Sequence, residues 1–320
     1  MLTGMHFLLT YMCNLKCDHC FVYSGPDANG TFTLDQIREA LDEAAKIGSI
    51  EWIYFEGGEA FLFYPLMMEG VRIARTRGFK VGIVTNAYFA TSEKDGELWL
   101  GPLCDLGIAD LSISDDSFHS GEEKDSPAKR ALAAAKRLGL TAGPICIEKP
   151  TIRAGKNKKQ GWGAPVTGGG AMLRGRAVEK LAGDLPKRPF KTFTECPYED
   201  LRRPKRVHLD SYGNVQLCQG LSMGDMWQTP LSELVRAYDA DSHPICGPLA
   251  SGGPVLLAKR YGIRPDDRYV DACHFCYLVR RALVDRFPRY LAPRQAYGME
   301  PCIVSPKRAG KRGNARMGRK

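Results

Sequence analysis

The sequence predicts an α/β fold in which helices cover a parallel sheet. Short apolar runs alternate with segments of helical periodicity through residues 6–147. The apolar runs are largely continuous, which is typical of strands that are buried on both faces. Polar or glycine-rich clusters follow several of these runs, as expected where ligands bind at the carboxyl ends of parallel strands.

The elements follow one another in regular order. The first strand is expected at residues 6–10, before a cysteine-containing loop. Thr33 and Gln36 form a capping box for a helix that Gly48 closes. The remaining units are predicted as strand 52–55, helix 65–77, strand 81–85, helix 93–106, strand 109–114, helix 127–138 and strand 141–147.

The pattern weakens after residue 147. Residues 150–170 hold many glycines and lysines and show no helical pattern. We place the sixth strand at residues 164–167 and a helix at 172–181. Two short strands around a Tyr-Gly-Asn turn are predicted at 206–210 and 215–218.

Composition indicates an ordinary globular protein of the cytoplasm. Of 320 residues, 44% are hydrophobic and 25% are charged. We find no apolar run that could span a bilayer and no signal peptide, so no membrane partner is expected. Eleven cysteines without an export signal indicate a reducing compartment and metal ligation rather than disulfides.

The net charge of +9 comes mainly from the end of the chain. Residues 306–320 carry seven basic side chains and no acidic one, and we expect a basic, disordered tail over 301–320. A second basic stretch at 153–159 is expected to be a mobile loop. Nucleic acid is not the partner we favour, although both segments leave RNA docking as an alternative.

Cys13, Cys17 and Cys20 form the most informative motif. Their spacing is C-x3-C-x2-C, directly after the first strand. Three clustered thiolates are one ligand short of a closed tetrahedral site, which leaves a coordination position for a substrate or cofactor. The alternatives are a zinc knuckle and three unrelated buried thiols.

This motif resembles the cluster motif of the radical S-adenosylmethionine (radical SAM) superfamily, with His19 where the family usually has an aromatic residue. The resemblance implies a [4Fe-4S] cluster whose free iron binds SAM. Reduction by a donor such as ferredoxin or flavodoxin would cleave SAM to methionine and a 5′-deoxyadenosyl radical. It also implies a partial (β/α)6 barrel as the core domain, over residues 1–190.

Three later motifs resemble the SAM-binding segments of that family. Gly57, Gly58 and Glu59 match its GGE motif, followed here by Ala60 instead of proline. The glycines would let a ligand approach the backbone, and the carboxylate would accept from the SAM ammonium group. A Gly-Gly turn with a surface glutamate is the alternative.

Asn86 ends the third predicted strand, and Ser112 and Ser114 lie on one face of the fourth. The resemblance implies that these three residues also contact SAM. For Asn86, a simple strand-terminating turn is an equal alternative.

Other polar residues near the predicted rim have less specific roles. Asp115, Asp116 and His119 are candidates for proton removal, but capping of the next helix explains them equally well. The catalytic acid or base is therefore unknown. Arg174 and Arg176 resemble a Gly-Arg-Ala segment of the family and could bind a carboxylate, although helix-face arginines are usually solvated.

A second set of cysteines comprises Cys196, Cys218, Cys273 and Cys276. It resembles the extensions called SPASM and twitch. Without further cysteines in residues 277–281, the match is to the shorter twitch type, with one auxiliary [4Fe-4S] cluster in a small α+β domain over 191–300. Zinc would use the same ligands, and Cys246 could replace one of them. The remaining thiols, expected in the core or tail, are Cys104, Cys146 and Cys302.

These observations predict a radical SAM enzyme that oxidises its substrate or forms a bond in it, with the auxiliary cluster accepting an electron. The substrate, a small molecule or a peptide, is not readable from the sequence. Because the chain starts at the first strand, no leader-peptide-binding domain precedes it, which mildly disfavours peptide maturation. The alternatives are a radical SAM maturase of protein, peptide or RNA, and a non-catalytic zinc protein.

Overall fold

The computed structural model describes residues 1–121, 124–155 and 163–299. Its first strands are β1 (Gly4–Thr10), β2 (Trp52–Gly57), β3 (Lys80–Thr85), β4 (Asp110–Ser114) and β5 (Ala142–Ile145). Between them lie α1 (Leu34–Ile47), the 3-10 turn η1 (Ala60–Phe63), α2 (Tyr64–Thr76), α3 (Glu93–Asp105) and α4 (Pro127–Arg137). Strands β1 to β5 pair in this order, and every pair is parallel. The predicted α/β fold with a parallel sheet is confirmed.

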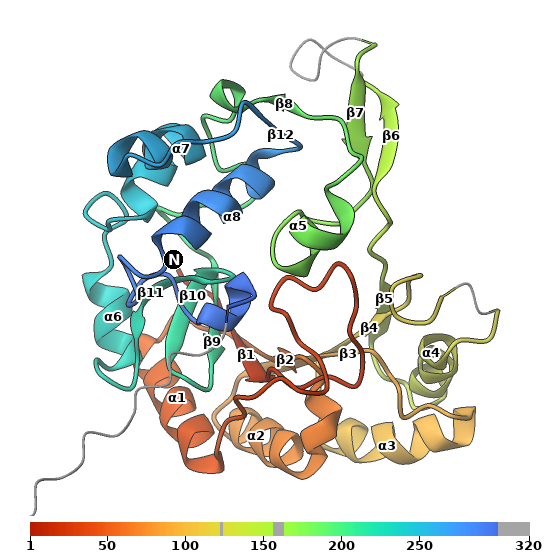
Figure 1. Ribbon diagram of the computed structural model, residues 1–320. Helices are drawn as coiled ribbons and strands as arrows, with labels where there is room; N and C mark the ends of the chain where they lie inside the picture. The colour runs from red at the N-terminus through yellow and green to blue at the C-terminus, as the bar shows by residue number, and fades with distance from the viewer. Residues whose placement is uncertain (122–123, 156–162, 300–320) are drawn as a thin grey trace, which may run out of the picture.

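The two faces of this sheet differ in chemistry. Helices α1 to α4 lie on its outer side in Figure 1, against side chains such as Phe7, Ile53 and Leu111, which are 0% exposed. The inward positions of the same strands include polar side chains such as Glu56 and Ser112. Strands β2 and β4 therefore alternate apolar and polar residues, because their inner face borders a cavity instead of a helix layer.

Helix α1 begins as its sequence predicts. Gln36 N donates to Thr33 Oγ1 at 3.3 Å, and Thr33 N donates to Gln36 Oε1 at 2.9 Å, which completes the capping box. Gly48 ends the helix with a left-handed φ of 74°. This helix anchors the chain where it returns from the cysteine loop.

The sixth strand is not where the sequence suggested. Residues 164–167 fall in β7 (Pro165–Gly168), which pairs antiparallel with β6 (Thr151–Ala154) in a separate hairpin. In Figure 1 this hairpin projects away from the main sheet. Its residues are largely exposed, so it lacks the apolar faces that a buried parallel strand needs.

The second half of the chain adds further strands and helices. The elements are α5 (Arg176–Leu181), β8 (Arg188–Pro189), η3 (Phe190–Thr192), β9 (Arg206–Asp210), β10 (Asn214–Cys218), β11 (Leu221–Asp225), α6 (Leu231–Ala237), α7 (Cys246–Tyr261), β12 (Arg268–Tyr269), α8 (Ala272–Leu283) and η4 (Arg294–Tyr297). Helix α5 starts four residues later than expected, because Gly175 has φ 62° and cannot continue a helix backwards.

Strand β9 joins the main sheet at the free edge of β1. The two strands are parallel, with His6 opposite His208. Strands β10 and β11 follow antiparallel, so the eight-stranded sheet has the order β11-β10-β9-β1-β2-β3-β4-β5. The two strands predicted around the Tyr-Gly-Asn turn are thus confirmed. Among the described residues, the sixth parallel strand of this sheet is β9.

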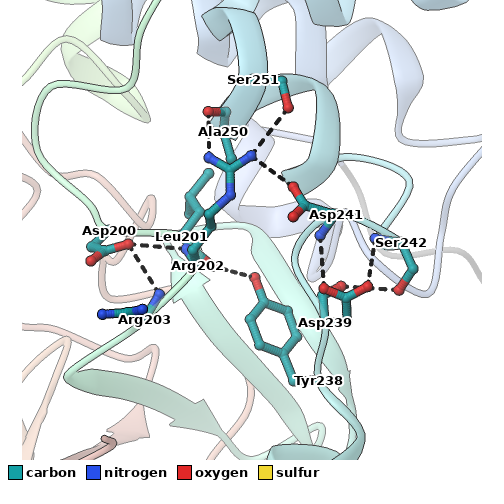
Figure 2. Close-up of polar contacts among 10 residues, drawn as sticks. All are labelled: Asp200, Leu201, Arg202, Arg203, Tyr238, Asp239, Asp241, Ser242, Ala250 and Ser251. Carbon is teal, nitrogen blue, oxygen red and sulfur yellow. Dashed lines mark hydrogen bonds and ion pairs between the residues drawn. The ribbon is translucent and has the colours of Figure 1, made fainter.

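Polar contacts hold the segment between Cys196 and β9 against helix α7 and the stretch that joins α6 to α7, as Figure 2 shows. Arg202 donates to Ala250 O at 2.8 Å and to Asp241 Oδ1 at 2.7 Å. Asp200 Oδ1 accepts from the backbone N of Arg202 at 3.1 Å and of Arg203 at 3.0 Å. Tyr238 adds a hydrogen bond from its hydroxyl to Leu201 O at 2.7 Å. These contacts fix the position of the chain that carries Cys196.

None of the described helices is both long and apolar enough to cross a membrane. The expected basic tail at 301–320, Cys302 and most of the basic stretch 153–159 lie outside the described residues.

Candidate metal and cofactor sites

One cavity of about 280 Å3 lies over the carboxyl ends of the parallel strands. Cys13, Cys17 and Cys20 all line it. Most of the other candidate residues from the sequence line it as well: Gly57, Gly58, Glu59, Asn86, Ser114 and His119. The structure therefore brings together segments that lie more than 100 residues apart in the sequence.

The three thiols of this cavity could bind a cation as thiolates. Leu15 N donates to Cys13 Sγ at 3.4 Å, and Ser24 N donates to Cys20 Sγ at 3.3 Å. Burial raises the pKa of Cys13 to about 11 and that of Cys17 to about 12. At neutral pH a cation must therefore displace their protons before they become ligands. The donor set, three soft sulfur atoms around one cavity, fits an iron–sulfur cluster or zinc.

Arg176 and Gly175 support the cysteine loop from behind. Arg176 is 5% exposed and donates to Cys17 O at 2.7 Å and to Ser24 O at 2.6 Å. A Cβ at Gly175 would lie 2.5 Å from the backbone of Phe21. The expectation that Arg176 is solvated is wrong, because its guanidinium replaces water around buried carbonyl groups.

Gly57 and Gly58 serve the packing of two loops against each other. A Cβ at Gly58 would lie 2.1 Å from Met12 O, and one at Gly57 would lie 2.4 Å from Thr10 O. Gly58 N donates to Thr10 O at 2.7 Å. The sequence assigned these glycines to the approach of a ligand. The structure adds that they allow the cysteine loop to approach β2.

We expect Gly58→Ala to lower the free energy of unfolding by about 3 kcal/mol, the upper end of the usual cost of overpacking, because the obstacle is backbone. The midpoint of chemical denaturation measures this. Gly183→Ala is the matched control, since a Cβ there has no heavy atom within 4 Å, and its effect should stay within about 0.5 kcal/mol. Equal effects in the two variants would contradict the packing argument.

Glu59 is more firmly bound to the protein than the sequence suggested. It is 1% exposed, and its carboxylate accepts from Phe61 N at 3.1 Å, Thr85 Oγ1 at 2.8 Å and Asn86 N at 2.7 Å. Burial raises the pKa of this carboxyl even though these three hydrogen bonds favour the charged form. Glu59 is thus not a surface residue of a simple turn. It ties the ends of β2 and β3 together beside the cavity.

Asn86 connects β3 to the cysteine loop. Its Nδ2 donates to Asn14 Oδ1 at 2.9 Å and lies 3.8 Å from Cys13 Sγ, while its Oδ1 accepts from Tyr88 N at 3.0 Å. The residue therefore stabilises the turn after β3 and also lines the cavity, and its contact with SAM stays a prediction.

The two serines of β4 are separated in depth. Ser114 lines the cavity, whereas Ser112 is not among its lining residues. Ser112 Oγ donates instead to Asp110 Oδ2 at 3.0 Å. Both side chains lie on the inner face, as the alternation predicted, but only Ser114 reaches the level of the three cysteines.

A His–Asp–His group lies at the rim of the same cavity. His119 Nδ1 is 2.8 Å from Asp116 Oδ1, and the rings of His19 and His119 are 5.2 Å apart. Asp116 also accepts from Phe118 N at 3.0 Å and Ile147 N at 3.1 Å. Burial lowers the pKa of His19 to about 4. Asp115 instead accepts from Ser126 Oγ at 3.1 Å, next to the start of α4, in line with the capping alternative.

The second cysteine set gathers around a small cavity of about 30 Å3. Cys196, Cys218, Cys273 and Cys276 line it, from a loop, from the end of β10 and from one turn of α8. Burial raises the pKa of Cys276 to about 11. Cys246 is fully buried at the start of α7 and is not one of the described residues that line this cavity.

Two buried arginines face these four thiols. Arg174 is 6% and Arg280 is 2% exposed. Arg174 Nη1 donates to Cys218 Sγ at 2.9 Å, and Arg280 Nη1 donates to Gln219 O at 3.0 Å. Within the described ranges, the Nε atoms of both arginines are buried without a hydrogen-bond partner. A buried cation needs a negative partner, so this surrounding fits four metal-bound thiolates.

Arg174 also lines the first cavity. Its guanidinium therefore lies between the two cysteine sets, with Met172 Sδ as a further acceptor at 3.2 Å. Sequence reasoning considered Arg174 for carboxylate binding and missed this bridging position, which only the fold creates.

Comparisons with known proteins agree with this geometry. Residues 7–147 match the family model of the radical SAM superfamily. The chain is 30% identical over 125 residues to YydG of Bacillus subtilis (strain 168), whose name assigns it to peptide biosynthesis, with 39% of each chain covered. It is 33% identical over 87 residues to the antilisterial bacteriocin subtilosin biosynthesis protein AlbA of the same strain, covering 27% of this chain and 19% of AlbA. It thus spans well under half of these relatives' lengths.

Among solved structures, the chain is similar to BtrN in complex with AdoMet and 2-DOIA. The sequence identity is 16% and the TM-score is 0.47, with 73% of this chain and 82% of BtrN covered.

Proposed function

We propose that this chain, whose residues 7–147 match the radical SAM family model, is a radical SAM enzyme that cleaves SAM reductively and abstracts hydrogen from a peptide. The single observation that carries the proposal is the cavity that joins three cysteines to the GGE segment at the ends of the parallel strands.

Cys13, Cys17 and Cys20 would hold a [4Fe-4S] cluster, since three thiols line one cavity. When bound and reduced, this cluster with SAM supplies a 5′-deoxyadenosyl radical. The protein's own part is to hold the loop: Arg176 and the backbone of Gly58 fix it from two sides. We assign the SAM contacts to the predicted residues that line this cavity, namely Gly57, Gly58, Glu59, Asn86 and Ser114. Ser112, which was also predicted to contact SAM, does not line the cavity and is left out of this assignment.

Cys196, Cys218, Cys273 and Cys276 would hold an auxiliary [4Fe-4S] cluster. The buried guanidinium groups of Arg174 and Arg280, whose Nε atoms have no hydrogen-bond partner in the described residues, support an anionic metal–thiolate centre here. A zinc ion bound by four thiolates carries a similar negative charge, so the two arginines fit a zinc site as well as an iron–sulfur cluster. Metal analysis distinguishes the two. Such a centre would bring residues 191–300 into the reaction as a cluster domain.

The names of two relatives support a peptide as the substrate. YydG is named for peptide biosynthesis and AlbA for the biosynthesis of a bacteriocin. A reduced ferredoxin or flavodoxin in the cytoplasm would supply the electron. A small molecule is the second candidate, on the resemblance of the second cysteine set to the twitch type.

The test is anaerobic reconstitution with iron and sulfide, followed by addition of SAM and a reductant. We expect about eight irons per chain, as for two clusters, and formation of 5′-deoxyadenosine. A deuterated peptide substrate should transfer deuterium into that product. Two zinc ions in place of the iron, with no SAM cleavage, would overturn the proposal.

A further inference from the structure

Three side chains below the cysteine cavity converge on the inner face of the sheet. His6 on β1 and His208 on β9 are register partners in two parallel strands, so they lie side by side on one face. Glu56 on β2 is opposite Leu8, two residues further along β1. Along the strand direction, Glu56 therefore lies two residues nearer to the cysteine loop than the two histidines do.

The ligand atoms of these residues have the spacing of a metal site. His6 Nδ1 lies 3.4 Å from Glu56 Oε2, and His208 Nε2 lies 3.2 Å from Glu56 Oε1. One such atom from each of the three residues lies within 4.8 Å of the other two. A zinc ion bound tetrahedrally at about 2.0–2.1 Å holds its ligand atoms about 3.3 Å apart. The two observed separations bracket that value.

Hydrogen bonding alone leaves this group incomplete. His6 Nδ1 is buried, and the Glu56 carboxylate oxygen lies 3.4 Å from it without the geometry of a hydrogen bond. A buried nitrogen that lacks a well-formed hydrogen bond is costly. A cation between them would bind both the nitrogen and the carboxylate oxygen. Two ligands of one metal ion lie close together without a hydrogen bond between them.

The surroundings hold the group in place and leave it accessible. Tyr54 stacks on the ring of His6 at 4.6 Å, and Trp52 stacks on Tyr54 at 5.7 Å, so the imidazole orientation is fixed. The side chains of the three converging residues are 10–17% exposed. Glu56 also lines the central cavity, which gives a path from the site to that cavity.

We propose that His6, Glu56 and His208 bind one divalent cation of the zinc class at the floor of the cavity. Two imidazoles and one carboxylate form the ligand set of catalytic zinc sites, which keep a further position open. That position would take a hydroxyl, carbonyl or carboxylate oxygen of the substrate and polarise it. The site does not depend on SAM chemistry, because none of its residues belongs to either cysteine set.

Equilibrium dialysis of the anaerobically reconstituted enzyme against Zn2+ tests the site, with zinc and iron measured in the same sample. We expect one zinc per chain beside the full iron content. Glu56→Gln and His208→Ala should each weaken zinc binding more than about tenfold. Even the loss of a residue that only hydrogen-bonds to a ligand lowers metal affinity about 10–100-fold. Iron content should not change. His119→Ala is the matched control, because His119 belongs to a separate group with His19 and Asp116. This variant should keep the zinc.

X-ray absorption at the zinc edge of the unaltered enzyme gives a readout that needs no variant. Nitrogen and oxygen ligands without sulfur are expected. Sulfur ligands, absence of zinc at full iron content, or zinc binding unchanged in Glu56→Gln and His208→Ala would each overturn the proposal. Iron content and 5′-deoxyadenosine formation test the radical SAM function separately, so the two proposals can fail independently.

Discussion

Replacing Cys17 by serine is expected to abolish SAM cleavage and to remove about four of about eight irons. Cys17 is the middle ligand of the proposed cluster, and Arg176 holds its carbonyl oxygen at 2.7 Å. A serine hydroxyl is a harder and far weaker ligand for iron than a thiolate. Loss of an outer-shell partner already costs 10–100-fold in metal affinity or activity, so loss of a ligand should reduce cleavage by more than about 100-fold.

The yield of 5′-deoxyadenosine and the iron content of the reconstituted variant measure this effect. Cys146→Ser is the matched control, because Cys146 is an exposed thiol outside both cysteine sets. It should keep both the iron and the cleavage rate. Unchanged SAM cleavage in Cys17→Ser would refute the assignment of the first site.

Replacing Cys276 by serine is expected to remove the other four irons, about half of the total, while SAM cleavage persists. The four thiols of this site share a cavity with Arg174 and Arg280. Without metal-bound thiolates, these guanidinium groups become buried charges without a negative partner. Such uncompensated charges typically cost 3–5 kcal/mol, so the variant should also be markedly less stable than the reconstituted enzyme.

Iron analysis, the melting temperature and the ratio of product to 5′-deoxyadenosine report the three effects. If the second cluster accepts the substrate electron, that ratio should fall in Cys276→Ser. Cys246→Ser is the control, as Cys246 is buried nearby but does not line the cavity. Should Cys246→Ser lose the iron and Cys276→Ser retain it, Cys246 would replace Cys276 as the ligand.

Local sequence signals were sufficient for most of the fold. The capping box at Thr33 and Gln36 and the apolar or alternating runs of β1 to β4 predicted the right elements, because each depends on residues close in the chain. The sixth strand failed because a short polar run such as 164–167 carries no apolar face. The true neighbour of β1 is β9, about 200 residues later, and no local signal encodes that pairing.

The same distinction between local and long-range features applies to the candidate site. The motif of Cys13, Cys17 and Cys20 could be predicted because it is defined by a spacing of a few residues. In the structure all three line one cavity. Arg174 and the pair of His6 and His208 were not readable in their roles. Their neighbours come from distant elements, so their significance exists only once β9 lies beside β1.

The pairing of β9 with β1 has a consequence for how this chain can be divided. β1 leads directly into the loop with Cys13, and it is hydrogen-bonded along both edges, to β2 and to β9. A fragment ending near residue 190 would leave one edge of that strand bare, with the apolar side chains of Val207 and Leu209 missing from the interior. Removing the second half of the chain is therefore expected to disturb the strand that leads into the first cysteine loop, as well as to remove the second cysteine set.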